Sequence, residues 1–199
     1  VKVLCADARR AAREGDPDMA VQRLGAALTT ARRAEADRTV ISSLVAIASV
    51  STVTSEARAL HAKGLITHQH SEQLAQRFAD LADMDFGLRA ALDTERRWHL
   101  IGIAMVSQIP YRQPIVEVSL RAFGSGSARA EEVNGFHDRL IDAWEGENRV
   151  VDLRRLQEEA DRGAFGPLME GQTELIVRTA ESLERIRDQL REIAGLLTR

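Results

Sequence analysis

The side chains best suited to bind a metal or to act as a base are the five histidines. His61, His68 and His70 are close in sequence, but residues two apart on a helix point to different sides, so His68 and His70 do not converge. Glu95 and His99 are four residues apart and share one helix face. A carboxylate di-metal bundle uses Glu-x-x-His on two helices, and that pattern does not occur in this sequence. We therefore expect exposed histidines, a surface contact between Glu95 and His99, and no metal.

Motifs for nucleophilic catalysis or phosphate binding are also missing from the sequence. Cys5 is the single cysteine, and its place in the first predicted helix favours a small core residue. No Gly-x-Ser-x-Gly elbow occurs, and Gly124-Ser125-Gly126 lacks the Gly-Lys-Ser/Thr ending of a phosphate-binding loop. We interpret the glycine-serine segment as a linker. We assign no catalytic residue, no cofactor-binding residue, no metal ligand and no cofactor.

One charged group lies next to positions that we expect to face inward. Glu95 is close to Leu92 and Trp98 on the same predicted helix, so we expect it to be partly buried. A buried carboxylate needs a partner, and an arginine on a neighbouring helix would supply one. The alternative interpretation is that Glu95, Arg96 and Arg97 line a small-molecule cavity.

The composition bounds the class of protein. The 199 residues are 44% hydrophobic and 29% charged, which is typical of a globular chain with a core. The net charge is −3, and the arginine-rich stretches also carry acids, so we predict no nucleic-acid partner. The longest apolar stretch, Leu100 to Val106, is too short to cross a bilayer, so we also expect no membrane span in this chain.

Aromatic residues make up only 4% of the chain, while alanine, leucine, arginine and glutamate are plentiful, which favours helices over strands. Gly15 is predicted to end the first helix and Pro17 to begin the second. The predicted N-terminal caps are Asp16, Asp37, Thr67 and Asn148. These signals predict an all-α antiparallel bundle of about eight helices. The expected ranges of the eight are 3–14, 17–31, 38–63, 68–82, 85–108, 128–145, 150–162 and 167 to near the end, and a further short helix is expected at 115–123.

Two of these helices have apolar patterns that predict how they pack. The middle of the third, from Val40 to Val50, is apolar nearly all round, which predicts burial on several sides. The fifth has an apolar face that we expect to point inward. Its members are Phe86, Leu88, Leu92, Trp98, Ile101 and Met105.

The long C-terminal helix carries a heptad seam, in which apolar positions step by three and four residues alternately. The seam consists of Ile176, Thr179, Leu183, Ile186, Leu190, Ile193 and Leu197. Such a narrow stripe faces one partner, which is either the chain's own helices or the same helix of a second molecule. We favour packing within the chain, and self-association is the alternative. The expected partners within the chain are Phe136, Leu140, Trp144, Leu153 and Leu156.

The segment with the clearest composition of a flexible linker is Gly124-Ser125-Gly126-Ser127. We place the one candidate domain boundary there. The prediction is a helical bundle over residues 1–123 and a C-terminal helical segment, 124–199, that packs on it. A single domain is the alternative.

The first hairpin resembles one tetratricopeptide unit. The matching residues are Ala8, Gly15, Asp16, Ala20, Leu24, Ala27 and Leu28. No second copy follows at the spacing of about 34 residues that this repeat family uses. The resemblance therefore implies a helical hairpin but not the concave peptide groove of the family.

The span from about Ala8 to Arg96 also resembles uncharacterised helical proteins that are common in planctomycete bacteria. The matching features are a Gly-Asp hairpin, a helix with the pattern Leu-Ile-x-x-Leu-Val-x-Ala, a glycine-led turn, a leucine-rich helix and a Glu-Arg pair. In this chain they correspond to Gly15-Asp16, the run from Val40 to Ala48, Gly64-Leu65, Leu74 and Glu95-Arg96. The resemblance implies a helical fold and a bacterial protein that is exported or membrane-anchored, and it implies no activity.

These observations favour a non-catalytic helical interaction or scaffold module within a larger bacterial protein, and not an enzyme. The alternatives are a small-molecule-binding helical bundle and an unrecognised hydrolase or metalloenzyme. The expected partner is a protein, or a second copy bound through the C-terminal helix. Because the chain begins at Val1, we expect a fragment or a processed form whose signal or anchor lies upstream. The resemblance points to the periplasm or cell envelope.

Overall fold

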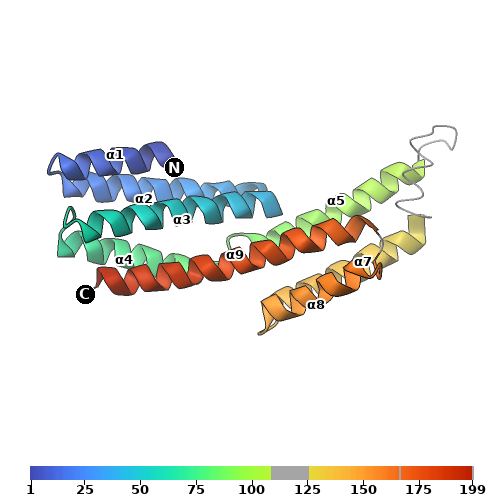
Figure 1. Ribbon diagram of the computed structural model, residues 1–199. Coiled ribbons are helices and arrows are strands. Elements are labelled where there is room, and N and C mark those ends of the chain that lie inside the picture. The colour runs from blue at the N-terminus through green and yellow to red at the C-terminus, as the bar shows by residue number, and fades with distance from the viewer. Residues whose placement is uncertain (109–125, 166, 199) are drawn as a thin grey trace. The chain divides into compact units, whose positions relative to one another are not determined.

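The computed structural model describes residues 1–108, 126–165 and 167–198. This described part contains eight α-helices, one short 3-10 helix and no strand, so the predicted all-α class is confirmed (Figure 1). The helices are α1 (Lys2–Arg13), α2 (Pro17–Arg33), α3 (Val40–Ala62), α4 (His68–Ala82), α5 (Leu88–Gln108), α7 (Gly126–Glu145), α8 (Arg149–Asp161) and α9 (Pro167–Leu197). The helix expected at 115–123 lies outside the described residues.

The turn between α1 and α2 forms as the sequence predicts. Gly15 adopts a φ of +84°, a left-handed conformation that glycine reaches without strain. The Asp16 side chain accepts a hydrogen bond of 2.9 Å from the backbone N–H of Met19, and Pro17 occupies the first helical position. The cap satisfies one N–H that the first helical turn leaves without an intrahelical partner.

The other three predicted caps behave differently. Asp37 does not cap α3, because it ends the 3-10 helix Ala34–Asp37 and α3 begins only at Val40. Thr67 does precede α4, but its side chain makes no capping bond and contacts His70 instead. Asn148 precedes α8, also without a side-chain cap bond.

The difference between these caps gives a direct test. Replacing Asp16 with Ala leaves the Met19 N–H without its partner and is expected to lower the free energy of unfolding by about 1 kcal/mol. Asn148→Ala is the matched control, because that side chain makes no capping bond, and it is expected to change stability little. Urea denaturation followed by far-ultraviolet circular dichroism measures both. Equal effects of the two substitutions would contradict the role given to Asp16.

The chain forms two compact units. Unit 1 comprises Val1–Asp37, Ile41–Gly87 and Ser182–Arg199, and unit 2 comprises Arg38–Val40 and Leu88–Glu181. Helix α9 contributes its first half to unit 2 and its second half to unit 1. The boundary predicted between residues 123 and 124 lies outside the described residues.

Unit 1 contains α1, α2, α4, most of α3 and the C-terminal half of α9. Its core is formed by apolar side chains from all five helices and from the turn before α5. The largest buried members include Leu24, Leu60, Leu74, Phe78, Phe86, Leu183 and Leu190. Polar contacts tie these helices together at the edge of the core: Arg9 of α1 pairs with Glu56 of α3, and Arg58 of α3 pairs with Glu192 of α9 at 3.1 Å.

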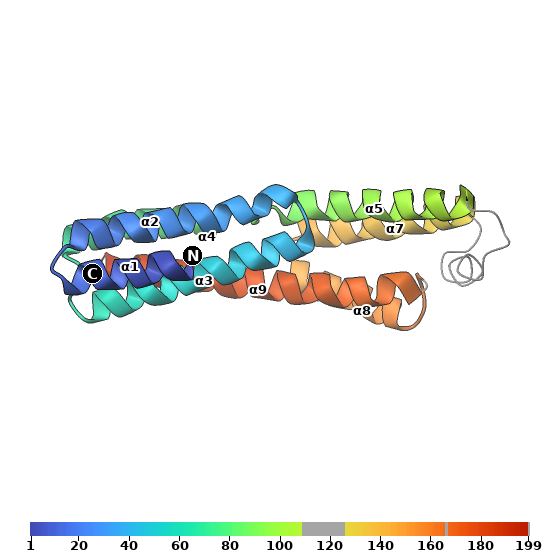
Figure 2. The same ribbon diagram turned by 90° about the horizontal axis from the view of Figure 1, so that it is seen from above.

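Unit 2 contains α5, α7, α8 and the N-terminal half of α9. Figure 2 shows α5 and α7 side by side, and side-chain hydrogen bonds join them. The five side chains expected to pack inside the chain are all buried. They are Phe136, Leu140, Trp144, Leu153 and Leu156.

The heptad seam of α9 is buried along its whole length. Each of its seven side chains is at most 2% exposed in the isolated chain. The seam is therefore part of the chain's own core. A second molecule that bound to α9 of this fold would therefore contact a different face of the helix.

Helix α3 is less completely buried than its apolar sequence predicts. Val40, Ile47 and Val50 are buried, but Ile41 is 66% exposed and Val45 is 51% exposed. By length and composition α3 is also apolar enough to cross a membrane. An 18-residue segment of it has a mean hydropathy of 1.5, and 56% of that segment is buried inside the structure. Core helices of water-soluble proteins meet the same criterion, so the expected absence of a membrane span stays a prediction.

Candidate functional site

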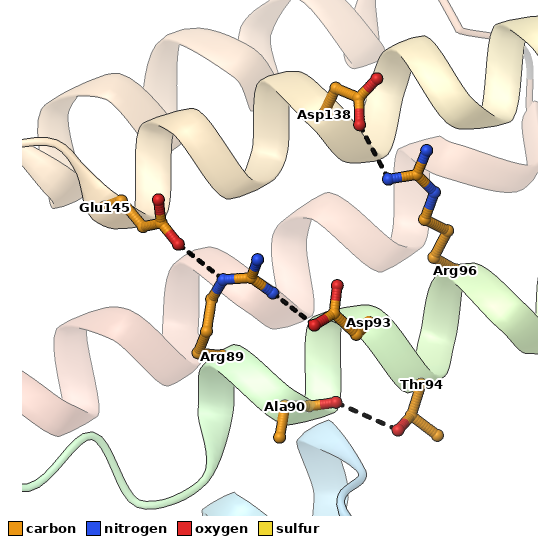
Figure 3. A network of polar contacts seen from close by, with 7 residues as sticks. All are labelled: Arg89, Ala90, Asp93, Thr94, Arg96, Asp138 and Glu145. Carbon is orange, nitrogen blue, oxygen red and sulfur yellow. Dashed lines mark hydrogen bonds and ion pairs between the residues drawn. The ribbon is translucent and has the colours of Figure 1, made fainter.

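Charged side chains join α5 to α7 at intervals of seven residues (Figure 3). Arg89 donates from Nε to Glu145 at 2.7 Å, and Arg96, seven residues further along α5, donates from Nη1 to Asp138 at 2.7 Å. Asp138 precedes Glu145 on α7 by the same seven residues. Steps of equal length in opposite directions define an antiparallel pair of helices with a fixed register.

The arginines also hold neighbouring groups in place. Arg89 donates to Asp93 on its own helix at 2.6 Å, and Arg96 donates from Nε to Asn134 of α7 at 2.8 Å. The two arginine side chains are 36% and 28% exposed, and the interhelical carboxylates are more exposed still. Partly solvated pairs of this kind contribute about 1 kcal/mol or less each, so their main effect is on register.

A pair of histidines lies in the same helix pair. His99 of α5 and His137 of α7 face each other with Nδ1 of His99 3.1 Å from Nε2 of His137. One ring donates the N–H and the other accepts it. His137 is fully buried against the edge of Phe136, with ring centroids 5.4 Å apart, and its Nδ1 has no hydrogen-bond partner.

Burial determines the protonation of this pair. It lowers the pKa of His137 from 6.5 to about 4, with further lowering by His99 and Arg96 that outweighs the opposite influence of Asp138 and Asp93. Burial also lowers the pKa of His99, against the influence of Glu95. At neutral pH both rings are therefore uncharged. The pair is a neutral, partly buried contact that acid would disrupt.

No described group of three or more His, Cys, Asp or Glu side chains is placed to hold a metal. His61, His68 and His70 do not converge on one point. Between Glu95 and His99 the interaction is the influence of the carboxylate charge on the pKa of the ring. The expected lack of a metal and of a cofactor stays a prediction.

Within the described part of the chain, Glu95 does not form the expected buried ion pair. Glu95 is half-buried and has no hydrogen-bond or ion-pair partner among the described residues. The arginine next to it, Arg96, makes the interhelical pair instead, while Arg97 is exposed. A one-residue step moves a side chain by about 100° around a helix, so Arg96 and not Glu95 faces α7.

At the start of α4, His70 connects three segments of unit 1. Its Nδ1 is 2.5 Å from the Thr67 hydroxyl, and its Nε2 is 2.8 Å from a carboxylate oxygen of Asp18 on α2. The ring is buried, while Asp18 is 91% exposed. This acid–histidine–hydroxyl series ties the N-terminus of α4 to that of α2.

The other two histidines of this region behave differently. His61 is half-buried, with its Nδ1 3.1 Å from the Ser71 hydroxyl, and His68 is exposed at 3.4 Å from Glu72. The expectation of three exposed histidines is therefore wrong for His70 and holds for His68. His68 and His70 do point to different sides, as their spacing predicts.

Cys5 is a buried core residue, as predicted, and lies close to the Arg9–Glu56 ion pair. Burial and the Glu56 charge raise the pKa of its thiol, which keeps the thiol protonated and poorly nucleophilic. Glu56 is 6% exposed and receives two hydrogen bonds from the Arg9 guanidinium. The cluster is a satisfied buried carboxylate beside an inert thiol.

Among the described residues of unit 2, exposed large apolar side chains gather on α5. Trp98 is 62% exposed, Ile101 47% and Met105 64%. Their spacing places them on one face of the helix. We call these three residues the α5 patch. The expectation that they point inward is wrong, because α5 packs on α7 through the face that carries Leu92, His99 and Ile103.

The burial of His137 could have been predicted from the apolar spacing of α7, although no catalytic or metal-binding motif includes this residue. Val133, His137, Leu140 and Trp144 are spaced by four, three and four residues, which is a heptad pattern with a histidine at one core position. A histidine in such a position predicts a buried ring.

Comparisons with protein-family models, with curated proteins and with solved structures give no match to this chain.

Proposed function

We propose that this chain is a non-catalytic helical interaction module whose unit 2 binds a protein partner through the α5 patch. The observation that carries the proposal is the exposure of Trp98, Ile101 and Met105 along one helix face. Large apolar side chains that cluster on a surface mark interaction sites, whereas single ones are ordinary.

The residue types also suit an interface. Tryptophan, methionine and arginine are enriched in the central parts of protein interfaces, and tryptophan dominates binding energy where it is buried by a partner. Arg97, next to Trp98, is exposed and has no ion-pair partner in the described part of the chain. A partner that offers an apolar surface beside a carboxylate would cover the patch and neutralise Arg97.

The proposal places this module in a larger bacterial protein that is exported or membrane-anchored. What supports that context is the resemblance of residues 8–96 to planctomycete helical proteins. The full-length precursor and the cell fraction in which it is found test it. A cytosolic precursor without an export signal or anchor would contradict this part of the proposal.

The patch is tested by a matched pair of substitutions. Ile101→Glu places a charge in the α5 patch, whereas Val151→Glu places one on α8 at a similarly exposed aliphatic side chain, 47% against 59% exposed. The immobilised wild type and the Val151→Glu variant are expected to retain the same protein from an extract of the source cells. The Ile101→Glu variant is expected to lose it.

The retained protein is then purified and titrated against the wild type, the Ile101→Glu variant and the Val151→Glu variant. Trp98 is exposed and Trp144 is buried, so covering the patch is expected to shift Trp98 emission to shorter wavelength. Trp98→Ala is expected to weaken binding by about 2 kcal/mol, or roughly 30-fold, if Trp98 is a central contact. A binder whose affinity is the same for wild type and Ile101→Glu would overturn the proposal.

A further inference from the structure

A second uncovered apolar surface lies in unit 1, on α3 and the C-terminal half of α9. The exposed side of α3 runs along one face at steps of three and four residues and carries no charge. It consists of Ile41, Val45, Ala48, Thr52, Ser55 and Ala59. We call these six residues the α3 face. The whole segment from Val40 to Ser55 is free of charged residues.

A groove borders this face where α3 meets α9. It has a volume of about 310 Å3, and its floor includes Ile47 and Ile186. Arg185 and Gln189 of α9 form its other side. Figures 1 and 2 show that α3 and this part of α9 lie side by side and run in the same direction.

Arg185 differs from the other described arginines of α9. Arg178, Arg187 and Arg191 each lie within ion-pair distance of a carboxylate in the chain. Arg185 donates only to the hydroxyl of Ser182, at 3.0 Å. One cation that lines the groove, Arg185, therefore has no carboxylate partner among the residues that the structure describes.

We propose that the α3 face and this groove bind a second copy of the chain about a two-fold axis, so that α3 meets α3 and α9 meets α9 in antiparallel orientation. The reason is that the surface complements itself. With the axis beside residue 50 of α3, Ile41 faces Ala59 of the other copy, Val45 faces Ser55 and Ala48 faces Thr52. Each larger side chain meets a smaller one, and no like charges oppose each other.

The charges on α9 fit the same axis. Glu192 lies seven residues after Arg185 and so on the same helix face. It pairs with Arg58 of its own chain at 3.1 Å but stays 65% exposed, which leaves its carboxylate accessible to a second cation. An antiparallel pairing centred between residues 188 and 189 brings Arg185 of each copy opposite Glu192 of the other. Because Ser51 and Gln189 line one groove, the centres at residue 50 of α3 and at residues 188–189 of α9 lie at the same level. Reciprocal contacts of this kind define a symmetric dimer interface.

The inference is independent of the α5 patch, which lies in unit 2. It is tested by sedimentation of the full chain between about 5 and about 200 µM, since a dimer of modest area is populated by mass action. The wild type and the Val151→Glu variant are expected to form dimers. Val45→Glu, at a position 51% exposed, is expected to stay monomeric with unchanged helix content.

A charge exchange tests the register. Each single variant, Arg185→Glu or Glu192→Arg, places two pairs of like charges across the axis. Each is therefore expected to raise the dissociation constant of the dimer at least about tenfold. The double variant restores both pairs and is expected to return to within about threefold of the wild type. Trp98→Ala is expected to leave the dimer unchanged.

Three outcomes would overturn the proposal. One is a wild type that stays monomeric throughout the concentration range. The second is a dimer that Val45→Glu leaves intact, which would place the interface elsewhere. The third is a monomer that sediments with vesicles of phosphatidylcholine and phosphatidylglycerol and loses this binding in Val45→Glu, which would make the α3 face a membrane surface.

Discussion

Lowering the pH from 7.5 to 5 is expected to reduce the free energy of unfolding by about 2 kcal/mol through His137 alone. The pKa of this ring is about 4 in the folded chain and 6.5 in the unfolded chain. Below pH 6.5 the unfolded chain therefore binds a proton that the folded chain does not. Stability is lost progressively as the pH falls from 6.5 towards 4, and His99 adds to the loss in the same direction.

The measurement is urea denaturation at several pH values, followed by tryptophan fluorescence. Trp98 and Trp144 are the only tryptophans, and both lie in unit 2 with the histidine pair. His137→Leu removes the titrating ring from its buried site and is expected to flatten the dependence between pH 6.5 and 4. His68→Leu is the control, because His68 is exposed, and it should keep the wild-type dependence.

An unchanged pH dependence in His137→Leu would show that other groups cause the acid effect. A steep dependence in wild type that vanishes with His68→Leu would contradict the assignment to the buried pair. At pH 7.5 the Leu variant is expected to fold, since it replaces a buried ring whose Nδ1 has no partner by an apolar side chain.

The helices could be predicted from the sequence because their signals are local. Capping and stop residues such as Gly15, Asp16 and Pro17 act within a few residues, and the apolar periodicity of α9 is visible along the chain itself. The seam of α9 was predicted as a narrow apolar stripe, and all of its members are buried.

The polar contacts could not be predicted, because they depend on register between helices distant in sequence. Arg96 was one of three adjacent charged residues, and only the pairing of α5 with α7 selects it to bind Asp138. His70 depends on Asp18, which lies 52 residues earlier in the chain. His137 had a periodicity signal, but its partner His99 is 38 residues away and on another helix.

The exposed faces show a different limit of sequence analysis. Trp98, Ile101 and Met105 were expected inside because large apolar side chains usually are, and their helical spacing fits a buried stripe equally well. Spacing reveals that side chains share a face but not what covers it. The same applies to Ile41 and Val45. These two surfaces are therefore where the structure adds most to a functional interpretation.

Replacing Leu190 with Arg is expected to cost about 4 kcal/mol or more, because it forces a charge into a position that is fully buried. Most domains have only about 5 to 15 kcal/mol of stability in total, so much of the helical signal near neutral pH is expected to be lost. Leu190→Ala is the milder variant, with an expected cost of about 3 kcal/mol from the cavity it leaves. Gln189→Arg is the control: it adds the same charge one residue away, where the side chain is exposed.

The result separates the two interpretations of the heptad seam. If the seam belongs to the chain's own core, Leu190→Arg loses helix content in circular dichroism at any protein concentration, and Gln189→Arg keeps it. If the seam instead joined two molecules, Leu190→Arg would leave a folded monomer with full helix content, and only the sedimentation coefficient would change. We expect the first result, because the seam positions from Ile176 to Leu197 are at most 2% exposed within a single chain.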